Sequence, residues 1–90
     1  MSIVVLKLMN GDEVIAKREI DGRFAKPRDF HMIPTERGMN GALMPYIMSC
    51  PDETVEIKAS AIMSEVEASK QMEDAYLQQT SGIDLVSKLN

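Results

Sequence analysis

Two side chains could combine as a nucleophile and a base, but little else in the sequence points to catalysis. Cys50 is the only cysteine and His31 the only histidine among the 90 residues, so a thiol–imidazole pair is the one arrangement to consider. No third group stands at a spacing typical of an orienting partner. The acidic pairs at 12–13 and 52–53 fall in expected turns, where carboxylates usually make local hydrogen bonds. The sequence therefore predicts that the protein is not an enzyme.

Neither a metal ion nor a phosphate-bearing cofactor is indicated. A structural zinc site needs a cluster of cysteines and histidines, and the chain contains one of each. A glycine-rich phosphate-binding motif does not occur in the sequence. We therefore expect no catalytic residues, no metal ligands and no cofactors, and a function that depends on binding and assembly.

The distribution of charge limits where a polyanion could bind. The net charge of −4 argues against a general electrostatic attraction to phosphate backbones. Residues 17–37 nevertheless carry six basic and four acidic side chains, whereas residues 51–90 carry three basic and eight acidic ones. A nucleic acid should therefore contact a surface built from 17–37. Because acids interleave with the bases, a solvated strand face is the simpler interpretation of that stretch.

Six short alternating segments, which would position these residues, predict a mainly β fold. They span residues 3–9, 13–20, 23–33, 42–49, 54–58 and 61–66. Asn10-Gly11 is typical of a type I′ hairpin turn, and Asp21-Gly22 indicates a second tight turn. Residues 34–41 have the composition of a glycine-rich loop, and Met39 and Met44 beside it suit an adaptable contact surface. Because Pro27 cannot donate a ladder hydrogen bond, it indicates an edge or a bulge.

The alternation also predicts the core, and a change of period predicts one helix. The side chains expected on the inner faces of the first two segments are Val4, Leu6, Leu8, Val14, Ala16 and Ile20. Ser69 is a plausible N-cap for an amphipathic helix over 70–80, Gly82 suits the position after it, and residues 83–90 form a short tail. We expect a strongly bent antiparallel sheet or barrel of five or six strands, with one C-terminal helix.

Size favours assembly of this domain with copies of itself. Ninety residues allow one small core, which we divide into a β domain over 1–68 and a helix with its tail over 69–90. A lone cysteine cannot form a stabilising disulfide within the chain and fits a reducing compartment. The N-terminus lacks the pattern of a signal peptide and no apolar run could span a bilayer. We expect a cytoplasmic homo-oligomer without a membrane partner.

Three segments resemble the sequence motifs of the Sm/LSm family. Residues 6–16 (LKLMNGDEVIA) are similar to the hydrophobic strand and Gly-x-x-Val-x-Gly element of its first motif. Residues 29–33 (DFHMI) resemble the Asp-x-x-Met-Asn element that leads into the third strand, and residues 55–62 (VEIKASAI) resemble the second motif. The positions that depart from the family pattern are Ala16, Ile33, Lys58 and Ala59. The chain looks most like the small Sm-like proteins of tailed phages of marine cyanobacteria, in which a helix follows the sheet.

The resemblance implies a ring that binds single-stranded nucleic acid, RNA more than DNA. Subunits of such rings, roughly five to seven of them, join through their edge strands. RNA lies around the inner rim, and the matching positions here are Asp29, Phe30, His31, Lys58 and Ser60. Phe30 or His31 would stack on a base, and Lys58 would meet a phosphate as a point charge. The implied role is in RNA processing or regulation.

Two other functions fit the same residues. The net charge of −4 and the scarcity of aromatic side chains favour a protein-binding adaptor or structural assembly module, with the helix over 70–80 contacting a protein partner. An isolated SH3-like or OB-like monomer is the third alternative. Solution mass and oligonucleotide binding separate the three.

Overall fold

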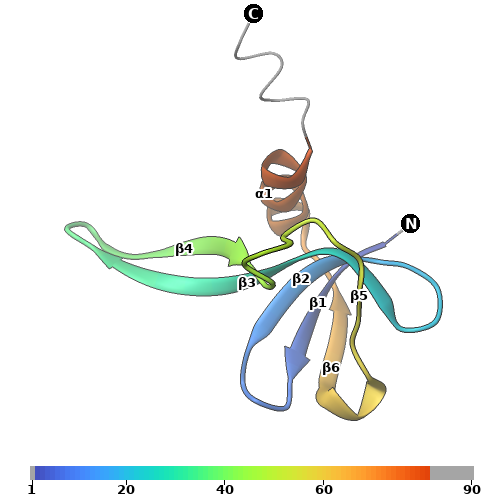
Figure 1. The fold of residues 1–90 in the computed structure, drawn as a ribbon. Coiled ribbons are helices and arrows are strands. Elements are labelled where there is room, and N and C mark those ends of the chain that lie inside the picture. Colours follow the sequence, from blue (N-terminus) through green and yellow to red (C-terminus); the bar gives the residue numbers. More distant parts are fainter. Residues whose placement is uncertain (1, 82–90) are drawn as a thin grey trace, which may run out of the picture.

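A strongly bent, open antiparallel sheet organises the computed structural model of the chain, which describes residues 2–81 (Figure 1). Its strands are β1 (Ser2–Leu8), β2 (Glu13–Arg18), β3 (Arg23–Thr35), β4 (Gly38–Pro45), β5 (Val55–Glu56) and β6 (Ile62–Glu67). Their lateral order is β4-β3-β2-β1-β6, and β5 pairs with the start of β3. A 3-10 turn, η1 (Ala59–Ala61), precedes β6, and α1 (Lys70–Thr80) follows it. The predicted mainly β fold with one C-terminal helix is confirmed.

Of the two predicted tight turns, the second rather than the first has the type I′ conformation. Asp21 and Gly22, between β2 and β3, have φ angles of 60° and 73°, and this turn type requires a positive φ at both central positions. At the predicted site, Gly11 has a φ of 98° but Asn10 is not among the residues with positive φ. The hairpin predicted at Asn10-Gly11 does join β1 to β2. Only the predicted type I′ conformation is wrong, because the longer connection needs a left-handed conformation only at its glycine.

A bulge bends β3 near its first third. The β2–β3 register shifts between Ile15 and Lys17, and opposite this shift Lys26 adopts a left-handed φ of 49°. Pro27 follows and is buried. A bulge adds an unpaired residue to one strand and makes it bend. The bulge predicted at Pro27 is thus confirmed, and it lets β3 pair with β5 before the bend and with β4 after it.

The β3–β4 hairpin projects from the rest of the sheet (Figure 1). Residues 34–41 were predicted to form a loop, but β3 continues to Thr35 and β4 begins at Gly38. The Thr35 hydroxyl donates to the Gly38 carbonyl at 2.7 Å and helps to fix the tip. All residues from 31 to 41, which we call the arm, are exposed. Since neither face of the arm is buried, its sequence carries no one-sided alternation.

Apolar side chains cover both faces of β1 and β2. The inner cluster contains Val4, Leu6, Leu8, Val14, Ala16, Phe24 and Ile57. A second cluster, on the face toward α1, contains Ile3, Ile15 and Tyr76. The predicted inner faces are confirmed except at Ile20, which lies beyond the end of β2 and is 78% exposed.

Tyr76 fastens α1 to the bulge of β3. The helix begins as predicted, because the Ser69 hydroxyl accepts a hydrogen bond from the backbone N–H of Met72 at 3.2 Å. The Tyr76 ring is buried, and its hydroxyl lies 2.9 Å from the carbonyl oxygens of both Ala25 and Lys26. The predicted Gly82 cap and the tail at 83–90 lie outside the described residues. Within 2–81, no helix is long and apolar enough to cross a membrane.

Replacing Tyr76 by phenylalanine should lower the free energy of unfolding by about 0.5–1.5 kcal/mol near neutral pH, since the carbonyl groups of Ala25 and Lys26 lose their hydrogen-bond donor. Burial raises the pKa of the Tyr76 hydroxyl from 10.0 to about 12. The folded state therefore holds this proton more tightly, so its contribution is complete below pH 10 and is lost as the pH rises toward 12. Urea unfolding across this range should show the difference between the wild type and Tyr76→Phe vanishing. A difference independent of pH would contradict the assignment.

Candidate nucleic-acid interface

The structure divides the five predicted site residues into separate groups. Asp29, Phe30 and His31 lie in the middle of β3, rather than at its start as the family pattern would place them. Lys58 precedes η1 and Ser60 lies within it. Both are exposed. In the described part of the chain, no ion pair connects the two groups.

Asp29 and His31 share the face of β3 that Val14 occupies on β2. His31 Nε2 lies 3.8 Å from Asp29 Oδ2, and the side chains are 52% and 18% exposed, respectively. Burial and the nearby Asp12 raise the pKa of the Asp29 carboxyl, and His31 opposes this shift. The second oxygen, Asp29 Oδ1, is buried without a hydrogen-bond partner. The ionised carboxylate is therefore incompletely solvated, and it stands beside an exposed imidazole.

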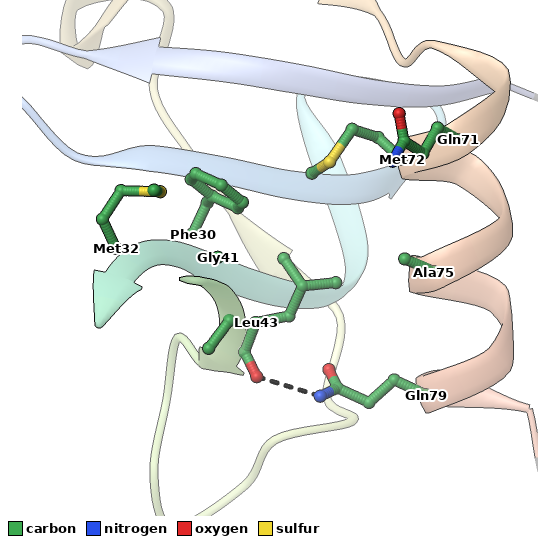
Figure 2. A pocket seen from close by; sticks show the side chains of 9 residues that line it. Phe30, Met32, Gly41, Leu43, Gln71, Met72, Ala75 and Gln79 are labelled. Atoms are coloured by element: carbon green, nitrogen blue, oxygen red, sulfur yellow. Dashed lines mark hydrogen bonds between the residues drawn. The ribbon is translucent and has the colours of Figure 1, made fainter. Parts of the chain in front are cut away.

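Phe30 points to the opposite face, toward α1 (Figure 2). It lines a groove of about 510 Å³ between β3, β4 and the helix, together with Met32, Leu43 and Met72 among others. The ring lies so close to Gly41 that a Cβ atom there would be 2.8 Å from two ring carbons. One side of the Phe30 ring is thus covered by β4. Of the two adjacent rings, His31 is the more exposed, and Phe30 is half-buried in the groove.

Lys58 and Ser60 lie on the far side of β1 and β2 from Asp29 and His31. The backbone N–H of Met9 donates to the Ala61 carbonyl at 2.8 Å, so η1 is held against the turn between β1 and β2. The sheet order places β2 and β1 between β3 and β6. Within the described chain the two groups therefore flank the β1–β2 turn.

Three of the six basic side chains over 17–37 make contacts within the chain. Arg28 is buried, and its guanidinium donates to the Pro51 carbonyl and to Asp52 Oδ1, the latter at 2.6 Å. Lys26 Nζ donates to the Thr80 carbonyl at 3.2 Å. Arg18 pairs with a glutamate on β6 at 3.0 Å. These contacts reduce the positive charge that this stretch can offer to phosphates.

Both lateral edges of the described sheet are unpaired. The Tyr46 N–H donates to the Pro27 carbonyl at 3.2 Å, so the even-numbered residues of β4 direct their backbone groups at β3. In an antiparallel ladder the alternate residues point the other way. Gln79 Nε2 accordingly reaches the Leu43 carbonyl from outside, at 2.9 Å (Figure 2). The backbone groups of Met39 and Gly41 therefore point outward from β4.

Exposed apolar side chains on the arm and beside it are the feature that motif matching missed. They are Met32, Ile33, Met39, Met44 and Met48. The unusual number of methionines, eight in the chain, is the signal that could have located this surface, because flexible thioethers suit adaptable contacts. The sequence does indicate Met39 and Met44 as a contact surface, but it does not show that both faces of a projecting hairpin are apolar.

Comparisons with known proteins add no support for the predicted family. No protein-family model and no curated protein matches the chain. The Sm-like resemblance therefore stays a prediction, based on the segments at 6–16, 29–33 and 55–62. What the site can do has to be inferred from its geometry.

Replacing Asp29 by asparagine should stabilise the protein at neutral pH. A raised pKa means that the folded state holds the carboxyl proton more tightly, so this contribution is present below the ordinary pKa of 3.8 and is lost as the pH rises through the folded value. Asp29→Asn, which carries no charge, should raise the thermal midpoint by a few degrees at neutral pH and lose this advantage in acid.

Asp52→Asn is the matched control with the opposite sign. The hydrogen bond from Arg28 lowers the pKa of Asp52, so its carboxylate stabilises the fold above pH 3.8 and that stabilisation is lost as the pH falls through the folded pKa. This variant should therefore melt earlier than the wild type at neutral pH. Thermal unfolding followed by circular dichroism measures both variants, and an Asp29→Asn protein that also melts earlier would contradict the role assigned to burial.

Proposed function

We propose that this chain is the subunit of a cytoplasmic, Sm-like homo-oligomeric ring that binds single-stranded nucleic acid, RNA in preference to DNA, in RNA processing or regulation. The observation that carries the proposal is the pair of unpaired edges, β4 and β6, at the two ends of one bent sheet. Each edge offers outward backbone groups that another strand can bond. Because β4 and β6 lie at opposite ends of the sheet, β4 of one copy can pair with β6 of the next, head to tail. A suitable rotation between successive copies closes such a chain into a ring.

The β4 edge has the properties of a strand that pairs with another chain. Residues 38–45 carry no charged side chain, although lysines and other charges are the usual protection of solvent-exposed edges. The arm, which includes the first part of β4, is a two-stranded ribbon. Such a ribbon is marginally stable when nothing packs on it. Pairing with a second copy would cover this ribbon and extend the small core of a 90-residue chain.

Ring closure would also repeat the weak binding groups. His31 could stack on a base, Lys58 could neutralise a phosphate, and Ser60 could bond a sugar or phosphate oxygen. In one subunit these groups are separated, and the net charge is −4. Repetition around a pore raises their effective concentration without any new contact within a subunit. The proposed activity therefore depends on assembly.

Met39→Pro should convert the ring to monomers of about 10.0 kDa. Proline removes an N–H that points out of β4, and it leaves the β3–β4 hydrogen bonds in place because residue 39 does not donate to β3. Glu36→Pro is the matched control, since position 36 is the second residue of the hairpin turn, where proline is favoured. Light scattering measures both masses. A wild-type protein that is already monomeric at micromolar concentration would refute the ring.

Lys58→Ala should weaken binding of short single-stranded oligonucleotides and reduce the slope of log K against log salt by about 1 for each site occupied. Lys70→Ala is the matched control, because Lys70 is an exposed lysine that pairs with Asp74 on α1. Fluorescence anisotropy with U-rich, A-rich and mixed RNA and DNA measures the affinities. Absence of binding by intact rings at low salt would reject the nucleic-acid function while leaving the assembly intact.

The same experiment separates the two aromatic candidates. Base stacking contributes about 1–3 kcal/mol per base, so His31→Ala should weaken binding about tenfold. Phe30→Ala should also weaken it, but less, because the Phe30 ring faces the groove beside α1 and rests on Gly41. If Phe30→Ala has the larger effect at unchanged solution mass, the bound strand lies on the helix side of the sheet.

The groove beside α1 supports a second candidate function, that of a protein-binding adaptor or assembly module. Its apolar floor includes Phe30 and Leu43, and the amides of Gln71 and Gln79 supply polar groups. Such a surface can hold an apolar peptide segment, and the net charge of −4 raises no objection to a protein partner. Recovery of one defined protein partner that resists nuclease treatment and is lost in Ala75→Arg would favour this function.

A further inference from the structure

The outward backbone groups of β6 belong to its two glutamates. The N–H of Ala68 donates to the Ile3 carbonyl of β1 at 3.0 Å, so Val66 directs its backbone groups at β1 as well. Because backbone direction alternates along a strand, Glu65 and Glu67 point theirs away from β1, toward the free edge. These are the residues of β6 that a neighbouring strand would bond.

The side-chain faces of the two edges follow from the registers. On β4, Gly41 lies opposite Met32 and Leu43 opposite Phe30, so the outward-bonding residues of β4 carry their side-chain positions on the face toward α1. On β6, Glu65 lies opposite Leu6, a residue of the inner core cluster. Its outward-bonding residues therefore belong to the other face. Val66, opposite Val5, is on the α1 face of its own subunit.

If β4 pairs antiparallel with the β6 of a second copy, only one arrangement of the side-chain faces is possible. Hydrogen-bonded residues that lie directly opposite each other have their side chains on the same face. Glu65 and Glu67 of the second copy must then lie on the α1 side of β4, and Val66 on the opposite side. The side of the hairpin opposite α1, where Val66 would lie, is the one that carries His31, Ile33 and Met44.

We infer that the exposed Val66 of one subunit occupies the apolar cleft of about 430 Å³ on the next subunit, where Ile33, Met44 and Met48 are among the lining residues and the exposed His31 stands beside them. This assignment rests on the proposed ring and names the contact that orients it. Val66 is 59% exposed, and the cleft residues Met44 and Met48 are 41% and 73% exposed. Burying these surfaces together removes apolar area from water on both subunits.

The polarity of the two faces favours antiparallel over parallel pairing. Antiparallel pairing places the two glutamates beside the groove that contains the Gln71 and Gln79 amides, and it places Val66 in the cleft lined mainly by methionine, isoleucine and proline. Parallel pairing would reverse both contacts and set carboxylates against that apolar cleft, where their desolvation is costly. All the ladders within the described sheet are antiparallel as well.

Disulfide trapping in a Cys50→Ser background tests the inference. Val66→Cys is combined in turn with Asn40→Cys and Ala42→Cys, two positions on the cleft face of β4 that cover alternative registers. Glu65→Cys with the same two partners is the matched control, because its side chain should lie on the other face. Each double variant is oxidised mildly and examined on a non-reducing gel, and its mass under reducing conditions is measured by light scattering.

The expected result is a ladder of covalent multimers for one Val66→Cys combination and none for either Glu65→Cys combination. Disulfides need Cα atoms within about 7 Å of each other, so residues on opposite faces are not trapped. Rings that cross-link through Glu65→Cys, or through neither position, would overturn the Val66 contact while leaving the ring proposal standing. Reduced proteins that are all monomeric would instead defeat the ring itself.

Discussion

The contact between the Tyr76 hydroxyl and the carbonyl groups of Ala25 and Lys26 is the constraint on which the rest of this structure depends. These carbonyls lie at the bulge where β3 bends, so a buried side chain of the helix holds the irregular part of the sheet. The bend in turn separates the part of β3 that pairs with β5 from the part that carries the projecting hairpin. Helix position, sheet curvature and the exposure of the β4 edge are therefore one linked arrangement.

The sequence predicts the elements whose inner face is regularly apolar. Val4, Leu6 and Val14 alternate because they line the inner core cluster, whereas Ile3 and Ile15 on the other face of the same strands pack with Tyr76 of α1. Ser69 marks the helix start through its own hydroxyl. The hairpin at 34–41 was not predicted because both of its faces are exposed. Its sequence therefore lacks the alternation of apolar and polar residues that indicates a strand. Both tight turns were predicted, but the type I′ conformation was assigned to the wrong one, because loop length and register, which are set by the whole sheet, decide the turn type.

The candidate site shows the same limit at longer range. Asp29 and His31 are two residues apart on one strand, so their shared face follows from the sequence alone. Their distance from Lys58 depends on the order of four strands, which no local pattern contains. The fate of Arg28, which is turned inward to the loop at Asp52, is equally non-local. Fewer basic side chains of residues 17–37 are therefore available to bind a polyanion than the composition suggests.

The hydrogen bond from Gln79 to the Leu43 carbonyl limits how far this sheet can propagate. It places a helix side chain over one end of the β4 edge and leaves only a short stretch near the tip with both backbone groups accessible. Long, flat and apolar edges invite indefinite stacking into fibrils. Here the Gln79 side chain of α1 occupies one outward carbonyl of an uncharged edge and so shortens the stretch of β4 that another strand could bond.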